Sequence, residues 1–524
     1  MASIASRRYG IGITVLLAVV AAAVGGFVLF QSGNAKGVDL TTANLVPQDA
    51  GVYFAINTDL GSSQWVAAFK LIEKLGQDKP EDELKNSVED LGNLDWENDV
   101  APLLGGNAAI YFKSFSIRDF DVQGALILKC KDSEKALKVL RRQLPVDFSK
   151  AKHGGIEYYR GEDGGGYIAR LGDHIVLAIN EESLFDVMDV HAGKSKSLAD
   201  ADGFRKLRND LTNNFLTFMY VSPEDFAGKA LLDDKEFQDA LKAAGASDIV
   251  FEPVAWVFGA KTRGFEFQAA SLGKSGSISP LVKARQSKLA SVMPAEAAVF
   301  VSMANISQTW KEAITTARPQ IDSAVKREGK YRNLDEALKD AGRQLGLRSI
   351  EDLINLFNGE TAIGIWFPTK DDNDPEVVLI AEVSDVKKAE EVLSKVATSA
   401  QAKPRTSEIS GVKVTTVRGD DGEDVSYAFK DGNLLLGTPG AIKAVLESKK
   451  GAIADNKAYK DTRSQIETKF GAFAYVDLKT VLRLASAGIP AQLDEAEKAL
   501  EGIFLNIVEQ DGLVRFTGFL TIAD

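Results

Sequence analysis

Histidine is the residue type with which a search for catalysis begins, because its side chain titrates near neutral pH. The chain has three: His153, His174 and His191. The first adjoins two glycines, the second follows a turn-like Gly-Asp pair, and the third ends a helical pattern. Their spacing matches no metal-ligand motif such as H-E-x-x-H. We therefore interpret all three as surface turn residues, and we expect no catalytic residue, metal ion or cofactor.

Acidic turns are the second group of residues with functional chemistry. Residues 371–376, DDNDPE, alternate oxygen ligands that Ca²⁺ would accept, but they lack the glycine and the closing glutamate of an EF-hand loop. Residues 418–424, RGDDGED, contain an Arg-Gly-Asp tripeptide, whereas the corresponding turn at 160–164 reads RGEDG. We interpret these segments as solvated hairpin loops without metal. An interaction surface is expected at their acids: Glu162, Asp163, Asp371, Asp372, Asp374, Asp420, Asp421 and Asp424.

Glycine-rich segments give no stronger signal. Gly164-Gly165-Gly166 and Gly105-Gly106 could cradle an anion, but neither stands between a strand and a helix, as a phosphate-binding loop requires. The nucleophile motif G-x-S-x-G does not occur. An enzyme is therefore our third hypothesis, since it would need a site assembled from distant residues.

These candidates lie on a chain that repeats itself. Residues 45–54, LVPQDAGVYF, recur as residues 292–301, VMPAEAAVFV, with proline, acid, alanine, valine and aromatic in register. Three further segments, at 106–110, 160–164 and 215–221, match segments at 359–363, 418–422 and 470–476 in the same order. A duplication predicts two equivalent lobes, and it provides an internal comparison for every candidate site.

Hydrophobic periodicity predicts the elements of each repeat. Turns such as 162–164 and 172–173 join neighbouring strands and make them antiparallel. Because helices fall between groups of hairpins, we expect an α+β fold with two homologous tandem lobes, each a mainly antiparallel sheet with helices packed on one face. Segments 124–190 and 376–448 suggest ferredoxin-like topology. In the first repeat we predict strands at 52–57, 107–112, 122–130, 156–160, 166–171, 174–180, 215–221, 254–260 and 264–270.

The same patterns set the domain boundaries. The first repeat is predicted at 45–273 and the second at 292–524. Residues 274–291 form a linker, which begins with Gly and Ser and continues as a helix-like stretch at 281–290. Polar residues 31–44 are predicted to be a flexible stalk.

An apolar segment precedes the stalk. Residues 11–30 carry no charge, and about 20 residues of helix span roughly 30 Å, the thickness of a bilayer core. Arg7 and Arg8 lie just before it, so residues 1–10 should be cytoplasmic and the bulk of the chain extracytoplasmic. The alternative is a cleaved signal peptide, whose apolar core is usually shorter, at about 7–15 residues. We predict a retained single-pass transmembrane anchor in the cell membrane.

Composition and charge limit the classes of partner that the chain could bind. The formal net charge is −12, and no run of basic residues is long enough to follow a phosphate backbone, so nucleic acid is not an expected partner. The single cysteine, Cys130, cannot form an internal disulfide. It ends the apolar run 124–130, and we predict that it is a packed strand residue rather than a reactive thiol.

The pattern Pro–x–acid–Ala–x–Val–aromatic behind an apolar N-terminal segment, seen at Pro47–Tyr53 and at Pro294–Phe300, resembles a bacterial membrane-anchored family known as domain of unknown function 3352. The resemblance implies an exported, anchored protein without an assigned activity, and it supplies no functional residues. Two hypotheses follow. The first is a non-catalytic binding or scaffold protein of the cell envelope whose partner is an envelope protein or lipid. The alternative is a carrier of a lipid or other apolar ligand in a cavity of the lobes.

Overall fold

The structure is a computed structural model, and its described residues form two compact units. These residues are 40–92, 94–116, 121–144, 146–162, 165–226, 252–273, 276–368, 374–399, 403–419, 422–447, 449–466, 469–485 and 498–523, with 235 and 239. The first unit ends at Gly273, and the described part of the second begins at Gly276. The predicted N-terminus at 1–10 and anchor at 11–30 lie outside the described residues. Within the described ranges, no helix combines the length and the apolar character needed to cross a membrane.

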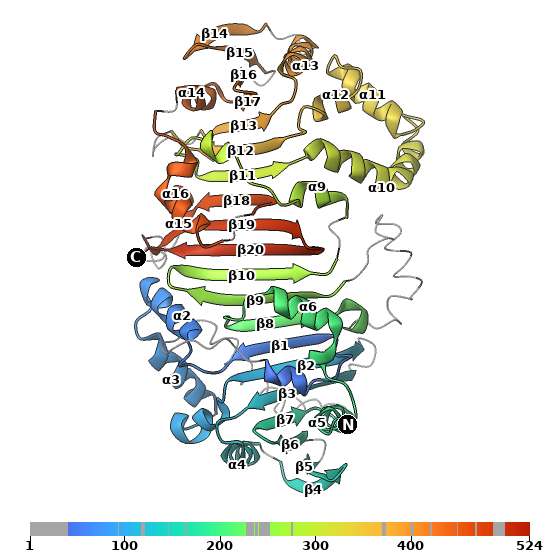
Figure 1. The fold of residues 1–524 in the computed structure, drawn as a ribbon, viewed down its shortest axis with the longest axis vertical. Coiled ribbons are helices and arrows are strands. Elements are labelled where there is room, and N and C mark those ends of the chain that lie inside the picture. The colour runs from blue at the N-terminus through green and yellow to red at the C-terminus, as the bar shows by residue number, and fades with distance from the viewer. Residues whose placement is uncertain are drawn as a thin grey trace. The chain divides into compact units, whose positions relative to one another are not determined.

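The first unit combines a meandering sheet with helices (Figure 1, blue to green). Its helices are α2 (Ser63–Lys74), α3 (Pro80–Gly92), α4 (Ser133–Gln143), α5 (Glu181–His191) and α6 (Asp202–Asp210). Its strands are β1 (Val52–Asn57), β2 (Asn107–Ser116), β3 (Asp121–Lys129), β4 (Phe148–His153), β5 (Ile156–Gly161), β6 (Tyr167–Leu171), β7 (His174–Ala178), β8 (Thr217–Val221), β9 (Val254–Lys261) and β10 (Gly264–Ser271). They pair in the order β4-β5-β6-β7-β3-β2-β1-β8-β9-β10, always antiparallel.

The second unit follows the same plan. Its helices are α9 (Ser279–Val282), α10 (Ile306–Glu328), α11 (Leu334–Gln344), α12 (Glu351–Ile354), α13 (Val386–Ser399), α14 (Pro439–Glu447), α15 (Lys457–Arg463) and α16 (Leu478–Ala485). Its strands are β11 (Val299–Ala304), β12 (Glu360–Trp366), β13 (Glu376–Glu382), β14 (Arg405–Ile409), β15 (Val412–Arg418), β16 (Asp424–Lys430), β17 (Asn433–Gly437), β18 (Ala472–Asp477), β19 (Leu500–Gln510) and β20 (Leu513–Ile522). Their order, β14-β15-β16-β17-β13-β12-β11-β18-β19-β20, matches the first unit strand by strand.

The predicted α+β class and antiparallel pairing are therefore confirmed, but two finer expectations are wrong. The segments 124–190 and 376–448 are not ferredoxin-like. In each, four consecutive strands form a meander whose last strand pairs with the first strand of the segment, and no strand pair among the described residues is parallel. The helices also do not share one face of the sheet. In β17, Leu434 packs with residues of α13, whereas the next residue, Leu435, packs with residues of α14. Since consecutive strand residues point to opposite faces, α13 and α14 cover opposite sides.

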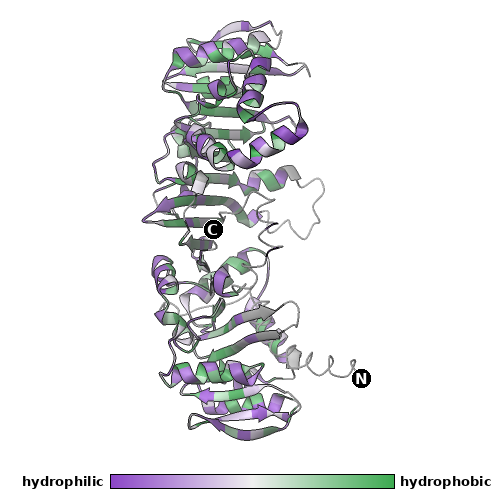
Figure 2. Ribbon diagram, turned by 90° about the vertical axis from the view of Figure 1, so that its right-hand side faces the viewer, coloured by the Kyte–Doolittle hydropathy of each residue, from purple (hydrophilic) through white to green (hydrophobic). Residues whose placement is uncertain are grey.

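The first unit shows the same arrangement. In β5, Tyr158 contacts Phe185 of α5, whereas the next residue, Tyr159, lies under Arg141 of α4. Helices α4 and α5 therefore cover opposite faces of this sheet as well. Much of the hydrophobic colour in Figure 2 follows the strands, while hydrophilic residues line the outer sides of the helices. Each sheet is thus a middle layer, and its two faces both contribute to the core.

The connecting segments are more ordered than predicted. Residues 40–44 of the expected stalk belong to the first unit: they include the 3₁₀ helix η1 (Thr41–Asn44), where the buried Thr42 hydroxyl lies 2.7 Å from that of Tyr53. Most of the expected linker at 274–291 belongs to the second unit. Its predicted helix at 281–290 is wrong, because α9 ends at Val282 and Arg285 instead exchanges two backbone hydrogen bonds with Phe470, at 2.7 and 3.0 Å.

Candidate functional site

The predicted acidic loops are only partly described. Asp163, Asp371, Asp372, Asp420 and Asp421 lie outside the described residues. Glu162 is exposed in the first unit, and Asp374 and Asp424 belong to the second. Val378 and Ser426 both pair with Gly437 of β17, so β13 and β16 begin at the same end of the sheet, two strands apart. The first described residues of β13 and β16 therefore lie at the same end of the sheet, on either side of β17.

Asp424 has a structural role within this acidic end. Its carboxylate accepts hydrogen bonds from Arg418 Nε at 2.9 Å and from Arg405 Nη2 at 2.6 Å. The hydrogen bond from Arg418, and then that from Arg405, lower the pKa of Asp424 below its usual range. The three side chains tie together the ends of β14, β15 and β16. Asp424 is thus already partnered by two arginines.

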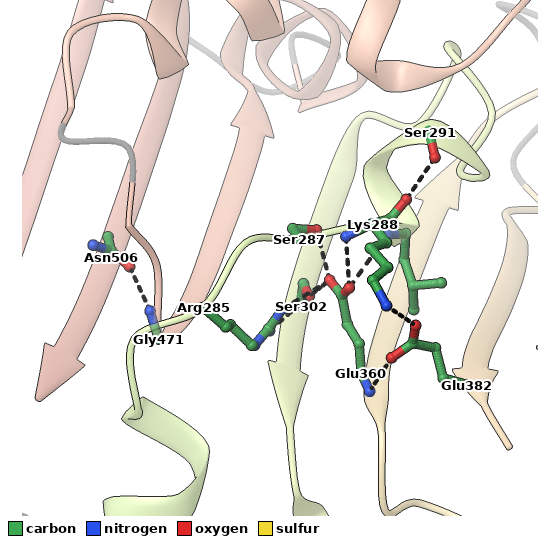
Figure 3. Close-up of polar contacts among 10 residues, drawn as sticks. Arg285, Ser287, Lys288, Ser291, Ser302, Glu360, Glu382, Gly471 and Asn506 are labelled. Atoms are coloured by element: carbon green, nitrogen blue, oxygen red, sulfur yellow. Dashed lines mark hydrogen bonds and ion pairs between the residues drawn. The ribbon is translucent and has the colours of Figure 1, made fainter. Parts of the chain in front are cut away.

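A larger polar cluster surrounds Glu360, the first residue of β12 (Figure 3). Its Oε1 accepts hydrogen bonds from the hydroxyls of Ser287 and Ser302, both at 2.6 Å. Its Oε2 accepts from the backbone N–H groups of Lys288 at 2.7 Å and Leu289 at 3.3 Å. Only 4% of Glu360 is exposed, so these donors replace the water that a carboxylate would otherwise bind.

Arg285 completes this Glu360 cluster. Its Nη1 lies 2.9 Å from Glu360 Oε1, and its Nη2 donates to Ser302 Oγ at 3.0 Å. Glu382 accepts from the backbone N–H of Glu360 at 3.0 Å and pairs with Lys288 Nζ at 3.3 Å. Burial raises the pKa of Glu360, but the serine hydroxyls, the Lys288 amide and the Arg285 charge together outweigh it, so the pKa lies below its ordinary value. The carboxylate is ionised at neutral pH.

The Glu360 cluster fastens a chain segment rather than performing chemistry. Its carboxylate is saturated with donors, and its serines point their hydroxyls at that carboxylate, so neither a base nor a nucleophile is left available. The cluster holds residues 285–289 against Ser302 of β11 and Glu360 of β12. By strand register, Asn107 and Ala55 stand in the first unit where Glu360 and Ser302 stand in the second. The cluster is therefore a feature of the second unit alone.

The recurring proline motif also has a structural role. The carbonyl of Val46, before Pro47, accepts a hydrogen bond from Leu198 at 2.7 Å, and that of Met293, before Pro294, accepts one from Ile453 at 2.8 Å. Both donors open short 3₁₀ helices, η5 (Leu198–Asp200) and η8 (Ile453–Asp455). The motif thus joins the segment before β1 to η5 and the segment before β11 to η8. This equivalent contact in the two units explains why the motif recurs.

The histidines do not gather into a site. His153 Nε2 lies 3.0 Å from Asp189 Oδ1, and its ring stacks on Phe185. His191 is exposed at the end of α5. His174 departs from the predicted surface turn, because it is 9% exposed in the fully buried strand β7. Its Nδ1 lies 2.7 Å from Asp173 Oδ1. Within the described ranges, no group of three or more His, Cys, Asp or Glu side chains could hold a metal ion.

Acidification should weaken the first unit through His174. Burial lowers the pKa of His174 below its model-peptide value of 6.5, although Asp173 opposes the shift. Below pH 6.5 the unfolded imidazole binds a proton that the folded one does not, so stability is full above this pH and falls as the pH decreases. Asn433 stands at the matched position of β17. His174→Asn should therefore reduce the loss of β7 protection between pH 7.5 and 5.5, measured by hydrogen exchange; an unchanged loss would contradict this.

Cys130 should be inert in the folded protein. It is 5% exposed, and burial raises its pKa to about 12, so the reactive thiolate is scarce at neutral pH. We expect negligible labelling by a maleimide at pH 7 under native conditions and complete labelling in denaturant, both measured by intact mass. Rapid native labelling would show that β3 opens frequently at its end.

Comparison with known proteins assigns the chain to a family. The family described as "Protein of unknown function (DUF3352)" matches residues 11–516, which is nearly the whole chain. The chain therefore belongs to this family, and the resemblance seen in the sequence is confirmed. No functionally curated protein matches the chain.

Solved structures provide only distant likenesses. Crystal forms I and III of TP0453 each match with 10% identity and a TM-score of 0.23. These matches cover 44% and 45% of this chain and 79% and 80% of the other. At this TM-score the likeness carries no argument about fold or function.

Proposed function

We propose that the chain is a single-pass membrane protein whose extracytoplasmic bulk consists of two homologous lobes that bind another component of the cell envelope without catalysis. The proposed anchor is supported by the uncharged segment 11–30 behind Arg7 and Arg8. The family match itself begins at residue 11, so the apolar segment lies within the region that members of the family share.

The observation that carries the binding proposal is the contrast between core and surface in the two units. The first hydrogen bond of each helix aligns α4 with α13: Ala136 N–H donates to Asp132 O, and Ala389 N–H donates to Asp385 O. At matched core positions the two units have the same buried residue, as in Ala136/Ala389, Val139/Val392 and Tyr220/Tyr475. Matched surface positions differ in charge, as in Lys138/Glu391 and Arg141/Ser394. Lys152 and Glu157, which oppose each other across β4 and β5, exchange their charges with Glu408 and Lys413. A preserved fold with diverged surfaces is the pattern of lobes that contact different partners.

The anchor and its orientation can be tested with single cysteines. In a Cys130→Ser background, Ser32→Cys places a thiol after the apolar segment and Ser3→Cys places one before it. We expect a membrane-impermeant maleimide to label the first variant in intact cells and the second only after lysis. The protein should also resist extraction from membranes at alkaline pH. Release into the soluble fraction would show that residues 11–30 are a cleaved signal.

The binding role can be tested by crosslinking in intact cells. Photoreactive residues at Glu162, Asp374 and Asp424 sample the predicted acidic surfaces, and a photoreactive residue at Asp202, whose side chain is 93% exposed, serves as a comparison. We expect a defined protein adduct from at least one acidic site and none from the comparison. Adducts to lipid alone would favour the carrier hypothesis, and adducts at none of the sites would count against an interaction surface there.

A further inference from the structure

The edge strand β4 of the first unit combines an open backbone with positive charge. Within the described ranges, β4 pairs with β5 alone, so one row of its backbone N–H and C=O groups faces away from the sheet. Lys150 and Lys152 are exposed and alternate along the strand, which places them on the same face. Such an edge is competent to accept a further strand.

A helix adds a third cation to the same face. Lys150 opposes Tyr159 of β5, and the guanidinium of Arg141 in α4 lies 4.3 Å from the centre of the Tyr159 ring. Lys150 Nζ lies 5.5 Å from that centre and pairs with Glu157 at 2.8 Å. Neither Arg141 nor Lys152 forms an ion pair with a described carboxylate. The ring holds Arg141 in place while its N–H groups stay available to an anion.

The second unit shows that the shared fold does not require these cations. Strand and helix registers place Ser394, Thr406, Glu408 and Thr415 where the first unit has Arg141, Lys150, Lys152 and Tyr159. Lysines on an edge strand also discourage aggregation, which is their plainer interpretation. That role needs only charge, however, and does not explain an arginine positioned from a neighbouring helix by an aromatic ring.

We propose that β4 receives an acidic, extended segment of a partner protein, which adds as a further antiparallel or parallel strand. Its backbone would bond to the open edge of β4, and acidic side chains two residues apart, at about 7 Å, would meet Lys150, Lys152 and Arg141. The open backbone edge of β4 favours an extended peptide over an anionic bilayer as the occupant, because lipid headgroups cannot continue the strand pairing. The inference rests on the proposed binding function and names the chemistry of one partner.

The test uses the full chain in nonionic detergent and an acetylated nine-residue peptide in which glutamate alternates with valine. We expect binding at low ionic strength that weakens with added salt. Replacing Arg141→Ser, Lys150→Thr and Lys152→Glu together imports the residues of the second unit and should weaken binding by at least about tenfold. A peptide with ¹³C-labelled carbonyls should show the infrared amide band of a strand when it is bound.

Controls separate this inference from simple charge attraction. Lys138→Glu also imports a second-unit residue, at a lysine that is 72% exposed on α4, and should change the affinity by less than about twofold. If the triple variant loses its circular dichroism spectrum, Lys152→Glu alone replaces it. The inference is overturned by an absence of binding, by equal binding to the variant, by binding without the strand band, or by equal binding of polyglutamate or phosphatidylglycerol vesicles. None of these results bears on the anchor or on the crosslinking test.

Discussion

Replacing Glu360→Gln is expected to lower the free energy of unfolding of the second unit by about 3–5 kcal/mol, the cost of breaking a buried ion pair from one side. The substitution removes the charge that Arg285 meets at 2.9 Å, and it leaves one amide group facing donors that all require an acceptor. The measurement is urea unfolding, followed by hydrogen exchange in β11 and β12 so that the second unit is reported separately. A loss below about 1 kcal/mol would show that water reaches the cluster.

Two comparisons make the Glu360 result specific. Glu382→Gln alters a side chain that is 34% exposed and can still accept from the Glu360 amide, so it should cost at most about 1 kcal/mol. Adding Arg285→Met to Glu360→Gln should recover part of the lost stability, because it removes the guanidinium charge that the first substitution leaves buried and unpaired. If the double variant is as unstable as the sum of the two single variants, the two groups act independently.

The Glu360 cluster also predicts how the second unit responds to acid. The folded pKa of Glu360 lies below the ordinary value of 4.5. Its stabilising contribution is therefore present above pH 4.5 and is lost as the pH falls through the folded pKa. Glu360→Gln should flatten the acid limb of the stability curve of β12, measured by hydrogen exchange between pH 5 and 3, whereas Glu382→Gln should leave that limb in place.

Phe504→Ala is expected to cost the second unit about 3–5 kcal/mol through the cavity that it leaves. Phe504 is fully buried, and its ring stacks on Phe473 with centroids 5.2 Å apart and lies 5.5 Å from Phe470. Denaturant unfolding of the full chain measures this loss. Phe516→Ala, at a half-buried position in β20, should cost less, and an equal loss would mean that the aromatic cluster is not the centre of this core.

The internal comparison explains why Phe504 cannot simply be replaced. Strand register places Ala255 of the first unit at the position of Phe504. There Phe204 of α6 lies against Tyr220 with ring centroids 5.3 Å apart, and Tyr459 and Tyr475 repeat this contact in the second unit at 5.1 Å. The ring of Phe504 is therefore an addition in the second unit, and the rings of Tyr459, Phe470 and Phe473 pack around it.

The sequence could predict the elements whose pattern is set locally. Helix α4, for example, begins at Ser133 because Asp132 accepts hydrogen bonds from the N–H groups of Glu134 and Lys135. Strand β4 was missed because SKAKH has no strongly apolar alternation: lysines stand on its exposed face, and its partly buried face carries only Ala151 and His153 in this stretch. The segment 281–290 has helical spacing, but Phe470 and Glu360 bind its backbone in another conformation, and tertiary contacts override propensity.

The candidate sites were less predictable because their partners are far apart in the chain. Ser287 and Glu360 are separated by 73 positions, and only the folded sheet brings them together. The one available signal was the contrast between Asn107 and Glu360 in otherwise matching segments. The shared end of β13 and β16 likewise depends on their common partner Gly437 in β17, which no local pattern reveals.

The path of residues 283–289 has a mechanical consequence. A force that pulls on the chain from the N-terminal side of the second unit acts on Lys283 and Arg285. Lys283 forms a parallel β-bridge with Glu509, and Arg285 exchanges backbone hydrogen bonds with Phe470. Tension then meets the contacts of Glu360 before it reaches β11. The fastening therefore distributes force over strands from both ends of the second unit's sequence, so that β11 is not loaded alone.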